Sequence, residues 1–295
     1  MRAKILVVGA SGLVGQSLVN ILDANDYKVV AAVKNDQNNL SIQKVKLDIS
    51  SPDEVEAVIG SEKPDIIINV AGLIGFGKCE SNPEEAAKLN TKGVRYLIQS
   101  ASSYNPLFVQ FSTDAVFSGD KGFYSETDCT EPRTVYGRTK LEGDEIVGSS
   151  SVPSLIVRPS VVYGKYMFER KDVRFIDSVL EALTKGEDFN VMTDTFNSPT
   201  FLDDLCEGVI FLLNQGVNGT FHLAGGERLS KYDLALKIAN QFRLDPRRII
   251  PVESKSMPNL SIYPRDNSLD ISKIKYVGYV PCDVDEGLTR YAQQR

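Results

Sequence analysis

The sequence predicts a doubly wound α/β fold, in which helices cover both faces of a parallel sheet, followed by a smaller C-terminal lobe. Two observations lead to this prediction. Apolar runs of four to eight residues alternate with helical patterns from the start of the chain, and such alternation is typical of parallel sheets with helical crossovers. Several of these runs are apolar at almost every position, which suits strands that are buried on both faces.

Six apolar runs are the predicted strands. They are Ile5 to Val8, Val29 to Val33, Ile66 to Val70, Leu107 to Phe111, Leu155 to Val157 and Thr220 to Leu223. The first helix is predicted by one apolar stripe at helical spacing, made of Val14, Leu18, Ile21 and Leu22. Another helix is expected to begin at Ser51-Pro52-Asp53-Glu54, because Ser-x-x-Glu forms a capping box and proline is favoured in a first turn.

The composition is that of an ordinary globular protein. The chain has 295 residues, with 42% apolar and 24% charged residues and a mean hydropathy of -0.15. It carries 39 acidic and 33 basic residues, a net charge of -6, so no broad positive field is expected to bind nucleic acid. Because the sequence shows neither a signal core nor an uninterrupted apolar run of about 18 residues, we expect no membrane partner and a cytoplasmic location.

The alternation of strand and helix patterns becomes irregular after about Gly164. We therefore expect a first domain over residues 1–164, rejoined by about 203–223, because the run around His222 has the pattern of a strand of the main sheet. The smaller lobe would comprise residues 165–202 and 224–295. His222 is the single histidine and no cysteines are spaced Cys-x-x-Cys, so no metal site is predicted.

A glycine-rich turn joins the first predicted strand to the first predicted helix. Here Gly9 permits a tight turn, Gly12 lets the backbone approach a pyrophosphate, and Gly15 lets helix and strand pack closely. Unpaired N–H groups at the helix start then face the anion. This pattern predicts a Rossmann-type NAD(P)-binding domain. Its predicted cofactor contacts in the turn are Gly9, Ser11, Gly12, Leu13, Val14 and Gly15.

The G-x-x-G-x-x-G spacing resembles that of the short-chain dehydrogenase/reductase superfamily. At the tip of the second predicted strand, Lys34 stands where a carboxylate would bind the ribose 2′-hydroxyl of NAD(H), and a lysine suits a 2′-phosphate instead. The sequence therefore favours NADP(H) as the cofactor, with NAD(H) as the second choice. By the same resemblance, Asp48 and Ile49 would contact adenine. The segment expected beside the nicotinamide ribose contains Ala71, Gly72 and Leu73.

A tyrosine and a lysine lie four residues apart, at Tyr136 and Lys140, and hence on one face of a helix. Thr113 follows a predicted strand, at the sheet edge where parallel sheets bind ligands. Reduction of a ketone leaves an alkoxide that needs a proton, and a phenol transfers one near neutral pH when its anion is stabilised. We predict that Tyr136 exchanges the proton, that Lys140 lowers the pKa of the phenol and holds the ribose hydroxyls, and that Thr113 polarises the carbonyl.

Over nearly its whole length the chain resembles dTDP-4-dehydrorhamnose reductases. The segments that carry this resemblance are Phe111 to Gly119, Glu126 to Asp128, Val135 to Gly143, Arg158 to Gly164, Asn197 to Thr200 and Asn267 to Asp270. The resemblance implies that Thr113, Tyr136 and Lys140 are the catalytic triad and that the smaller lobe binds substrate. Residues implied in contacts with a nucleotide sugar are Thr113, Asp114, Val161 and Arg265.

The predicted activity is NAD(P)H-dependent reduction of a 4-keto nucleotide sugar, first of all dTDP-4-dehydro-L-rhamnose to dTDP-L-rhamnose. Two alternatives stay open. Gly77, Val161 and Tyr263 depart from the reductase pattern, and residues 220–232 resemble the regulatory beta subunit of methionine adenosyltransferase, which would make the chain a non-catalytic cofactor-binding subunit. The other alternative is a nucleotide-sugar epimerase of the same superfamily. The superfamily resemblance also allows a homodimer.

Overall fold

A computed structural model of the protein describes residues 3–35, 42–165, 174–256 and 263–295. Its centre is a seven-stranded parallel sheet with the order β11-β6-β5-β4-β1-β2-β3. The chain moves outward from β1 first in one direction and then in the other, so the sheet is doubly wound. The strands are β1 (Lys4–Val8), β2 (Lys28–Val33), β3 (Gln43–Lys46), β4 (Ile66–Asn69), β5 (Leu107–Phe111), β6 (Ser154–Arg158) and β11 (Gly219–His222).

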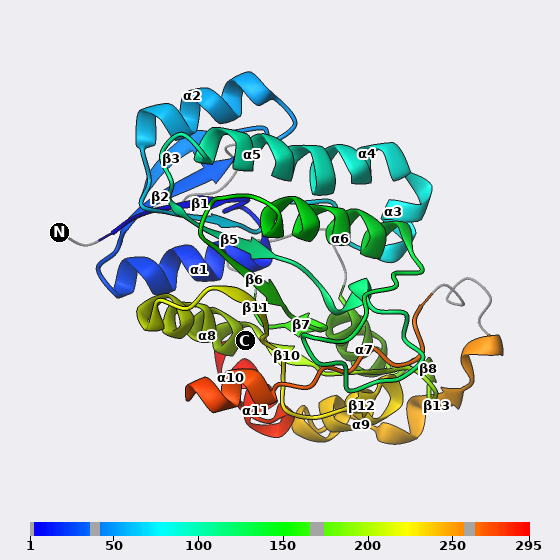
Figure 1. Ribbon diagram of the computed structural model, residues 1–295. Helices are drawn as coiled ribbons and strands as arrows, with labels where there is room; N and C mark the ends of the chain where they lie inside the picture. Colours follow the sequence, from blue (N-terminus) through cyan, green and yellow to red (C-terminus); the bar gives the residue numbers. More distant parts are fainter. Residues whose placement is uncertain (1–2, 36–41, 166–173, 257–262) are drawn as a thin grey trace.

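Helices cover both faces of this sheet (Figure 1). One face carries α2 (Pro52–Glu62), α5 (Gly93–Ala101) and α6 (Val135–Gly148), and the other carries α1 (Leu13–Ala24) and α8 (Leu202–Gln215). The segments α3 (Phe76–Ser81), α4 (Pro83–Ala87) and the π-helical turn η1 (Lys88–Lys92) lead from β4 into α5. The predicted α/β fold is thereby confirmed.

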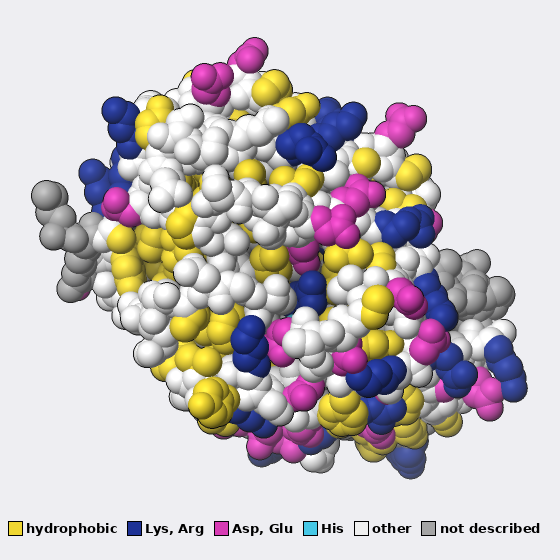
Figure 2. All heavy atoms as spheres, in the orientation of Figure 1, with side chains coloured by type: hydrophobic (Ala, Val, Ile, Leu, Met, Phe, Trp, Pro, Cys, Tyr) yellow, Lys and Arg dark blue, Asp and Glu magenta, His cyan; other side chains and the backbone are white. Residues whose placement is uncertain are grey.

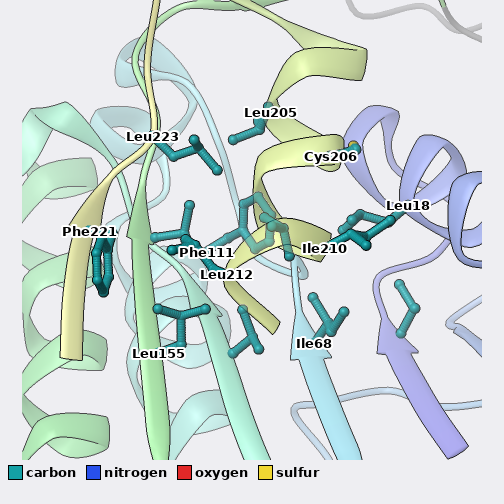
Figure 3. Close-up of a cluster of buried hydrophobic side chains, with 14 of the residues drawn as sticks. Leu18, Ile68, Phe111, Leu155, Leu205, Cys206, Ile210, Leu212, Phe221 and Leu223 are labelled. Atoms are coloured by element: carbon teal, nitrogen blue, oxygen red, sulfur yellow. The ribbon is translucent and has the colours of Figure 1, made fainter. Parts of the chain in front are cut away.

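Two apolar layers lie between the sheet and its helices. In Figure 3, side chains from β4, β5, β6 and β11 meet those of α8 and α1 on one face of the sheet. The predicted stripe on α1 belongs to this layer, and its members Leu18 and Leu22 are fully buried. The opposite layer joins the sheet to α2 and α5. Because the strands are apolar on both sides, each layer removes its own set of side chains from water.

A further hydrophobic cluster gathers residues from the second half of the chain. It is built around α7 (Phe175–Thr184), α9 (Lys231–Gln241) and α11 (Val284–Gln294). Three short strand pairs accompany it: β7 (Val162–Tyr163) with β10 (Thr200–Phe201), β8 (Phe189–Met192) with β13 (Ile249–Val252), and β9 (Phe196–Asn197) with β12 (Leu229–Ser230). The remaining short elements are η2 (Asp114–Val116), η3 (Pro246–Arg248), η4 (Ser254–Ser256) and α10 (Ser272–Val277).

The six predicted strands are present, with ends that differ by one residue at most at either side. Strand β3 is missing from the prediction because Gln43–Lys46 is largely polar and forms the edge of the sheet. The capping box at Ser51 is half right. The Ser51 side chain caps α2, but Glu54 accepts a hydrogen bond from the Asp48 amide at 2.9 Å.

The run around His222 returns to the main sheet as β11, beside β6, as expected. The boundaries near residues 164, 202 and 223 stay predictions, and residues 166–173 and 257–262 of the expected lobe lie outside the described residues. Charged side chains of both signs are interspersed on the face shown in Figure 2. Within the described ranges, no helix is long and apolar enough to cross a membrane.

Candidate active site at the carboxyl ends of the strands

The glycine turn has the geometry of an anion-binding turn. Gly9 has φ +86°, and a Cβ there would lie 2.7 Å from the Ala71 nitrogen. A Cβ at Gly15 would lie 2.3 Å from the Gly9 carbonyl oxygen, so α1 can approach the turn only with glycine at this position. Helix α1 starts at Leu13 and has no acidic residue in its first turn. Its first amides therefore form a suitable cradle for a pyrophosphate.

The other residues of the turn complete this cradle. Gly12 is the N-cap of α1 and its amide donates to the Gly9 carbonyl at 3.0 Å. The carbonyl of Ser11 accepts a hydrogen bond from Gln16 Nε2 at 2.8 Å. Leu13 and Val14 are half-buried first-turn residues of the helix. The turn is thus fixed by its own contacts, as preorganised anion binding requires.

Two of the predicted cofactor residues bind each other. Lys34 Nζ lies 2.8 Å from Asp48 Oδ2, at the carboxyl ends of β2 and β3. Burial alone would raise the pKa of Asp48, but Lys34 and Ser50 lower it to about 2. Asp48 raises the pKa of Lys34 in turn. Ile49 is buried beside this pair and packs against α5. Only the small exposed part of its side chain could therefore contact adenine.

Asn90 holds the loop that follows β4. This fully buried side chain accepts from the Leu73 amide at 2.8 Å and donates to the Leu73 carbonyl at 3.0 Å. It also donates to Thr139 Oγ1 on α6 at 3.0 Å. A Cβ at Gly72 would lie 2.6 Å from Asn90 Oδ1. The π-helical turn η1 carries Asn90, and such turns occur often at functional sites. Asn90 thus fixes Ala71, Gly72 and Leu73 relative to α6.

The end of β5 holds the two predicted catalytic residues of α6. The Phe111 carbonyl accepts a hydrogen bond from Lys140 Nζ. The Thr113 side chain hydrogen-bonds the Tyr136 side chain. Thr113 also accepts from the Ala115 amide at 3.2 Å, which orients its hydroxyl. The structure therefore brings Thr113, Tyr136 and Lys140 together, as the sequence predicts.

Helix α6 begins at Val135 because Thr134 caps it. The Thr134 hydroxyl accepts a hydrogen bond from the Gly137 amide at 3.0 Å. A Cβ at Gly137 would lie 2.1 Å from the Ala115 carbonyl oxygen, so glycine lets α6 press against η2. This close packing sets the distance between Tyr136 and the end of β5.

The electrostatics of the pair differ from the sequence-based expectation. Burial raises the pKa of Tyr136, and the hydrogen bond with Thr113 only partly opposes the rise. Burial also lowers the pKa of Lys140, and Asp144 opposes this change. The protein groups around Tyr136 therefore raise the pKa of its phenol, whereas the sequence predicts that Lys140 lowers it. A protonated phenol is the form that can donate a proton to an alkoxide.

A cavity of about 230 Å³ opens at Phe76, whose ring contacts Tyr136, and at Asp114, the residue after Thr113. Thr113, Tyr136 and Lys140 do not themselves line it. Predicted substrate residues Asp114 and Val161 line it. Arg265 does not, because its side chain is 74% exposed and lies 3.9 Å from Asp194. Further lining residues are Gly75, Phe76, Thr195, Asn197, Lys231, Tyr263, Pro264 and Asn267. The cavity is thus formed by residues from both parts of the predicted domain division.

Backbone strain and buried charge mark the two predicted lining residues. Val161 has φ +38°, a left-handed conformation that is unfavourable for a β-branched residue and concentrates at functional sites. Asp114 is buried, which raises the pKa of its carboxyl. Ser160 at 2.6 Å, Thr113 at 3.1 Å and Asn197 at 3.2 Å donate hydrogen bonds to it. The carboxyl is therefore rigidly held at the cavity wall.

Sequence reasoning missed several residues of this site. Phe76 contacts both Tyr136 and Tyr263 edge-to-face, with ring centroids 5.8 and 4.7 Å apart. Lys231 brings an ammonium group to the cavity from α9. Phe76 lies in the segment that follows the buried strand β4, at the sheet edge where parallel sheets bind ligands, and this position is a signal that the sequence offers. For Lys231 the sequence holds no comparable signal. In the described part of the chain, no cluster of three or more His, Cys, Asp or Glu side chains could hold a metal ion.

The fold and this arrangement define a class: a dinucleotide-binding α/β protein with a Tyr-Lys pair and a threonine beside its sheet edge. The model of the RmlD substrate binding domain family matches residues 3–295, and the chain belongs to that family. It is 30% identical to a dTDP-4-dehydrorhamnose reductase of Aggregatibacter actinomycetemcomitans, covering 97% of each chain. The predicted resemblance is thereby confirmed.

Two other similarities concern a related regulatory subunit and the fold. Methionine adenosyltransferase 2 subunit beta of Bos taurus is 27% identical, over 93% of this chain and 82% of that protein. A crystal structure of dTDP-4-dehydrorhamnose reductase from Bacillus anthracis, in complex with NADP, superimposes with a TM-score of 0.89 over the full length of both chains at 24% identity. The structural match supports the fold.

Proposed function

We propose that this chain is an NAD(P)H-dependent oxidoreductase that reduces the 4-keto group of a nucleotide sugar, most specifically dTDP-4-dehydro-L-rhamnose to dTDP-L-rhamnose. One observation carries the proposal. Thr113, Tyr136 and Lys140 are gathered at the end of β5, and their neighbours Asp114 and Phe76 line a cavity. Their side chains are the donor, acid and cation that carbonyl reduction requires.

The glycine turn and the ends of β2 and β3 fit a dinucleotide. Amides at the start of α1 would bind the pyrophosphate, and Lys34 would meet a 2′-phosphate, in keeping with the NADP complex of the Bacillus anthracis enzyme. NADP(H) is therefore the preferred cofactor and NAD(H) a possible one. When bound, the reduced cofactor supplies hydride to the carbonyl carbon. Lys140 would hold the ribose hydroxyls next to Tyr136.

Side chains of the protein supply the proton that the carbonyl oxygen needs. The Thr113 hydroxyl, which donates to Asp114 Oδ1 in this structure, would turn to donate a hydrogen bond to the carbonyl oxygen, and this bond favours negative charge on that oxygen. The Tyr136 phenol, kept protonated by burial, donates its proton to the same oxygen as the alcohol forms. The phenolate that remains is then stabilised by the Lys140 ammonium before a proton returns from solvent.

The cavity is the proposed sugar pocket. Asp114 and Val161 line it together with Asn197 and Lys231, and Asn197 Nδ2 lies 3.2 Å from the Asp114 carboxyl. We propose that the smaller lobe, residues 165–202 and 224–295, is the substrate-binding part, since it supplies Asn197, Lys231 and further lining residues. Phe76 and Tyr263 offer aromatic faces against which a 6-deoxy sugar can pack.

The test is consumption of NADPH absorbance by purified protein with dTDP-4-dehydro-L-rhamnose. Tyr136→Phe is expected to lower kcat at least about a thousandfold, because the proton donor is lost. The exposed Tyr276 gives the matched control Tyr276→Phe, which should keep full activity. Silence of the wild-type protein with every 4-keto nucleotide sugar would refute the proposal.

The relationship to methionine adenosyltransferase 2 subunit beta supports a second candidate, a cofactor-binding regulatory subunit. The same assay separates the two functions. A regulatory subunit would bind NADPH without consuming it, and it would change the kinetics of a partner enzyme. An epimerase would convert the sugar with no net change in nicotinamide absorbance.

A further inference from the structure

A second carboxylate lies behind the predicted catalytic residues. Asp144 follows Lys140 by one turn of α6, and both residues are buried, with 4% and 5% exposure. Residues four apart on a helix face the same side. Asp144 therefore points into the protein interior with Lys140, away from the cavity mouth.

Two neighbours fix the Asp144 carboxylate. Ser112 Oγ donates a hydrogen bond to Oδ2 at 2.5 Å, and Arg158 Nε lies 3.6 Å from the same oxygen. Ser112 stands between Phe111, which accepts from Lys140, and Thr113, which hydrogen-bonds Tyr136. Residues 111, 112 and 113 at the end of β5 thus contact residues 140, 144 and 136 of α6, respectively. These three α6 residues are spaced one helical turn apart.

The buried cluster combines two basic side chains with one carboxyl group. Arg158 is a cation, because a guanidinium does not lose its proton in proteins, whereas burial lowers the pKa of Lys140 and disfavours its ammonium form. Of the acidic groups that act on Lys140, the Cys79 thiol has a pKa raised by burial to about 11 and stays neutral. Asp144 is the carboxyl group that raises the pKa of Lys140. Burial raises the pKa of Asp144 itself, and Arg158, the hydrogen bond from Ser112 and Lys140 oppose that rise and favour the carboxylate.

The remaining titratable neighbours do not replace it. Asp114 acts on Tyr136 and is held by Ser160 at the cavity wall. Burial lowers the pKa of His222, near Arg158, to about 4, so this imidazole is neutral at pH 7. In the described part of the chain, the compensating negative charge for Lys140 is therefore concentrated at Asp144.

We propose that Asp144, held by Ser112 and Arg158, is a positioning residue that keeps Lys140 as an ammonium ion in its dry site. The proposal rests on the reductase function proposed above, because only a charged Lys140 can stabilise the phenolate of Tyr136. Asp144 is buried and does not line the cavity. It acts through Lys140, while Arg158 offsets part of its negative charge.

The test follows the titration of Lys140 by NMR in isotopically labelled protein, with its signal assigned by its loss in Lys140→Met. In Asp144→Asn the Lys140 midpoint should fall by about one pH unit or more, because the attraction is lost while Arg158 remains. In Arg158→Met the midpoint should rise. Asp144→Glu should restore it to within about half a unit of wild type.

Activity gives the second readout. We expect kcat of Asp144→Asn to fall about tenfold at pH 7, with a pH profile shifted in the same direction as the Lys140 midpoint, and KM for NADPH to change much less. The exposed neighbour Glu145 provides the matched control Glu145→Gln, which should change neither readout.

A purely structural role for the Asp144–Arg158 pair predicts lower melting temperatures in both variants with an unmoved Lys140 midpoint, and that result would overturn the inference. If Asp144→Asn does not fold, Arg158→Met still decides, since an unchanged or lowered midpoint contradicts the proposal. The Lys140 midpoint could shift in the variants as expected while the wild-type protein shows no turnover. That result would contradict the proposed reductase function and leave the role of Asp144 intact.

Discussion

Lys34 Nζ and Asp48 Oδ2 form a 2.8 Å ion pair between the carboxyl ends of β2 and β3. The pair restrains a lysine side chain that is still 55% exposed. A restrained, exposed cation loses less entropy on binding a phosphate than a free one. If Lys34 meets the 2′-phosphate as proposed, the ion pair would orient the lysine for that contact.

Lys34→Met should raise KM for NADPH about tenfold, since a charge-assisted hydrogen bond contributes about 1.5 kcal/mol. KM for NADH should change less than about twofold, because NADH lacks the 2′-phosphate. Lys28, exposed at the other end of β2, supplies the control Lys28→Met. An equal rise in KM for NADPH and NADH would show that Lys34 does not bind the 2′-phosphate.

The parts of this site that the sequence predicts are those encoded by short segments. Gly9 and Gly15 stand beside an apolar strand and an apolar stripe, and their roles follow from sterics within a few residues. Tyr136 and Lys140 share a helix face by their spacing alone. Thr113 is found because a buried strand ends just before it. Local chemistry is sufficient for each of these residues.

Residues that reach the site through long-range packing are not predictable in this way. Asn90 and Thr139 are 49 positions apart, yet they share a buried hydrogen bond. Lys231 meets Asp114 only because the smaller lobe packs on the sheet edge. Arg265, which the resemblance implies for substrate, is turned toward solvent. A family pattern gives the position of a side chain in the sequence, whereas packing decides where that side chain points.

Stability should fall on the acid side because of His222. The imidazole is fully buried, and burial with help from Arg158 lowers its pKa to about 4 from 6.5. The unfolded chain binds a proton as the pH falls below about 6.5, whereas the folded protein does so only near pH 4. The free energy of unfolding should therefore decrease by about 3 kcal/mol across this window through His222.

The measurement is urea denaturation of wild type and His222→Asn at pH values from 7 to 4. An asparagine can still contact the Asp270 carbonyl, which lies 3.2 Å from His222 Nδ1. The variant should lose about 3 kcal/mol less than wild type over the window, although it is less stable at pH 7 because of lost packing. Parallel curves for the two proteins would contradict this account.

Lys231 should set the affinity for the sugar. Its amine faces the cavity, and burial lowers its pKa to about 8 although Asp114 opposes the change. Lys231→Met should raise KM for the nucleotide sugar about tenfold at pH 7 and leave KM for NADPH unchanged. Wild-type affinity should weaken above about pH 8, where the ammonium loses its proton.

A control variant and an inhibitor test whether the effect of Lys231→Met is specific to the sugar. Lys237 lies on the same helix and pairs with Asp285 at 2.6 Å, so Lys237→Met is the matched control and should leave both KM values unchanged. Inhibition by dTDP alone locates the contact. Lys231→Met could weaken the binding of dTDP as much as the binding of the complete nucleotide sugar. In that case the lysine binds the nucleotide part, and the proposed contact with the sugar is wrong.

Gly15→Ala should abolish cofactor binding without unfolding the sheet. The new Cβ would lie 2.3 Å from the Gly9 carbonyl oxygen and 2.8 Å from the Ala10 Cα, so α1 must move away from the turn. Gly148→Ala provides the control, because a Cβ there meets no atom within 4 Å and alanine stabilises a helix by up to about 1 kcal/mol. In a thermal-shift titration, NADPH should stabilise wild type and Gly148→Ala but not Gly15→Ala. A normal titration of Gly15→Ala would place the pyrophosphate elsewhere and remove the basis for the cofactor assignment.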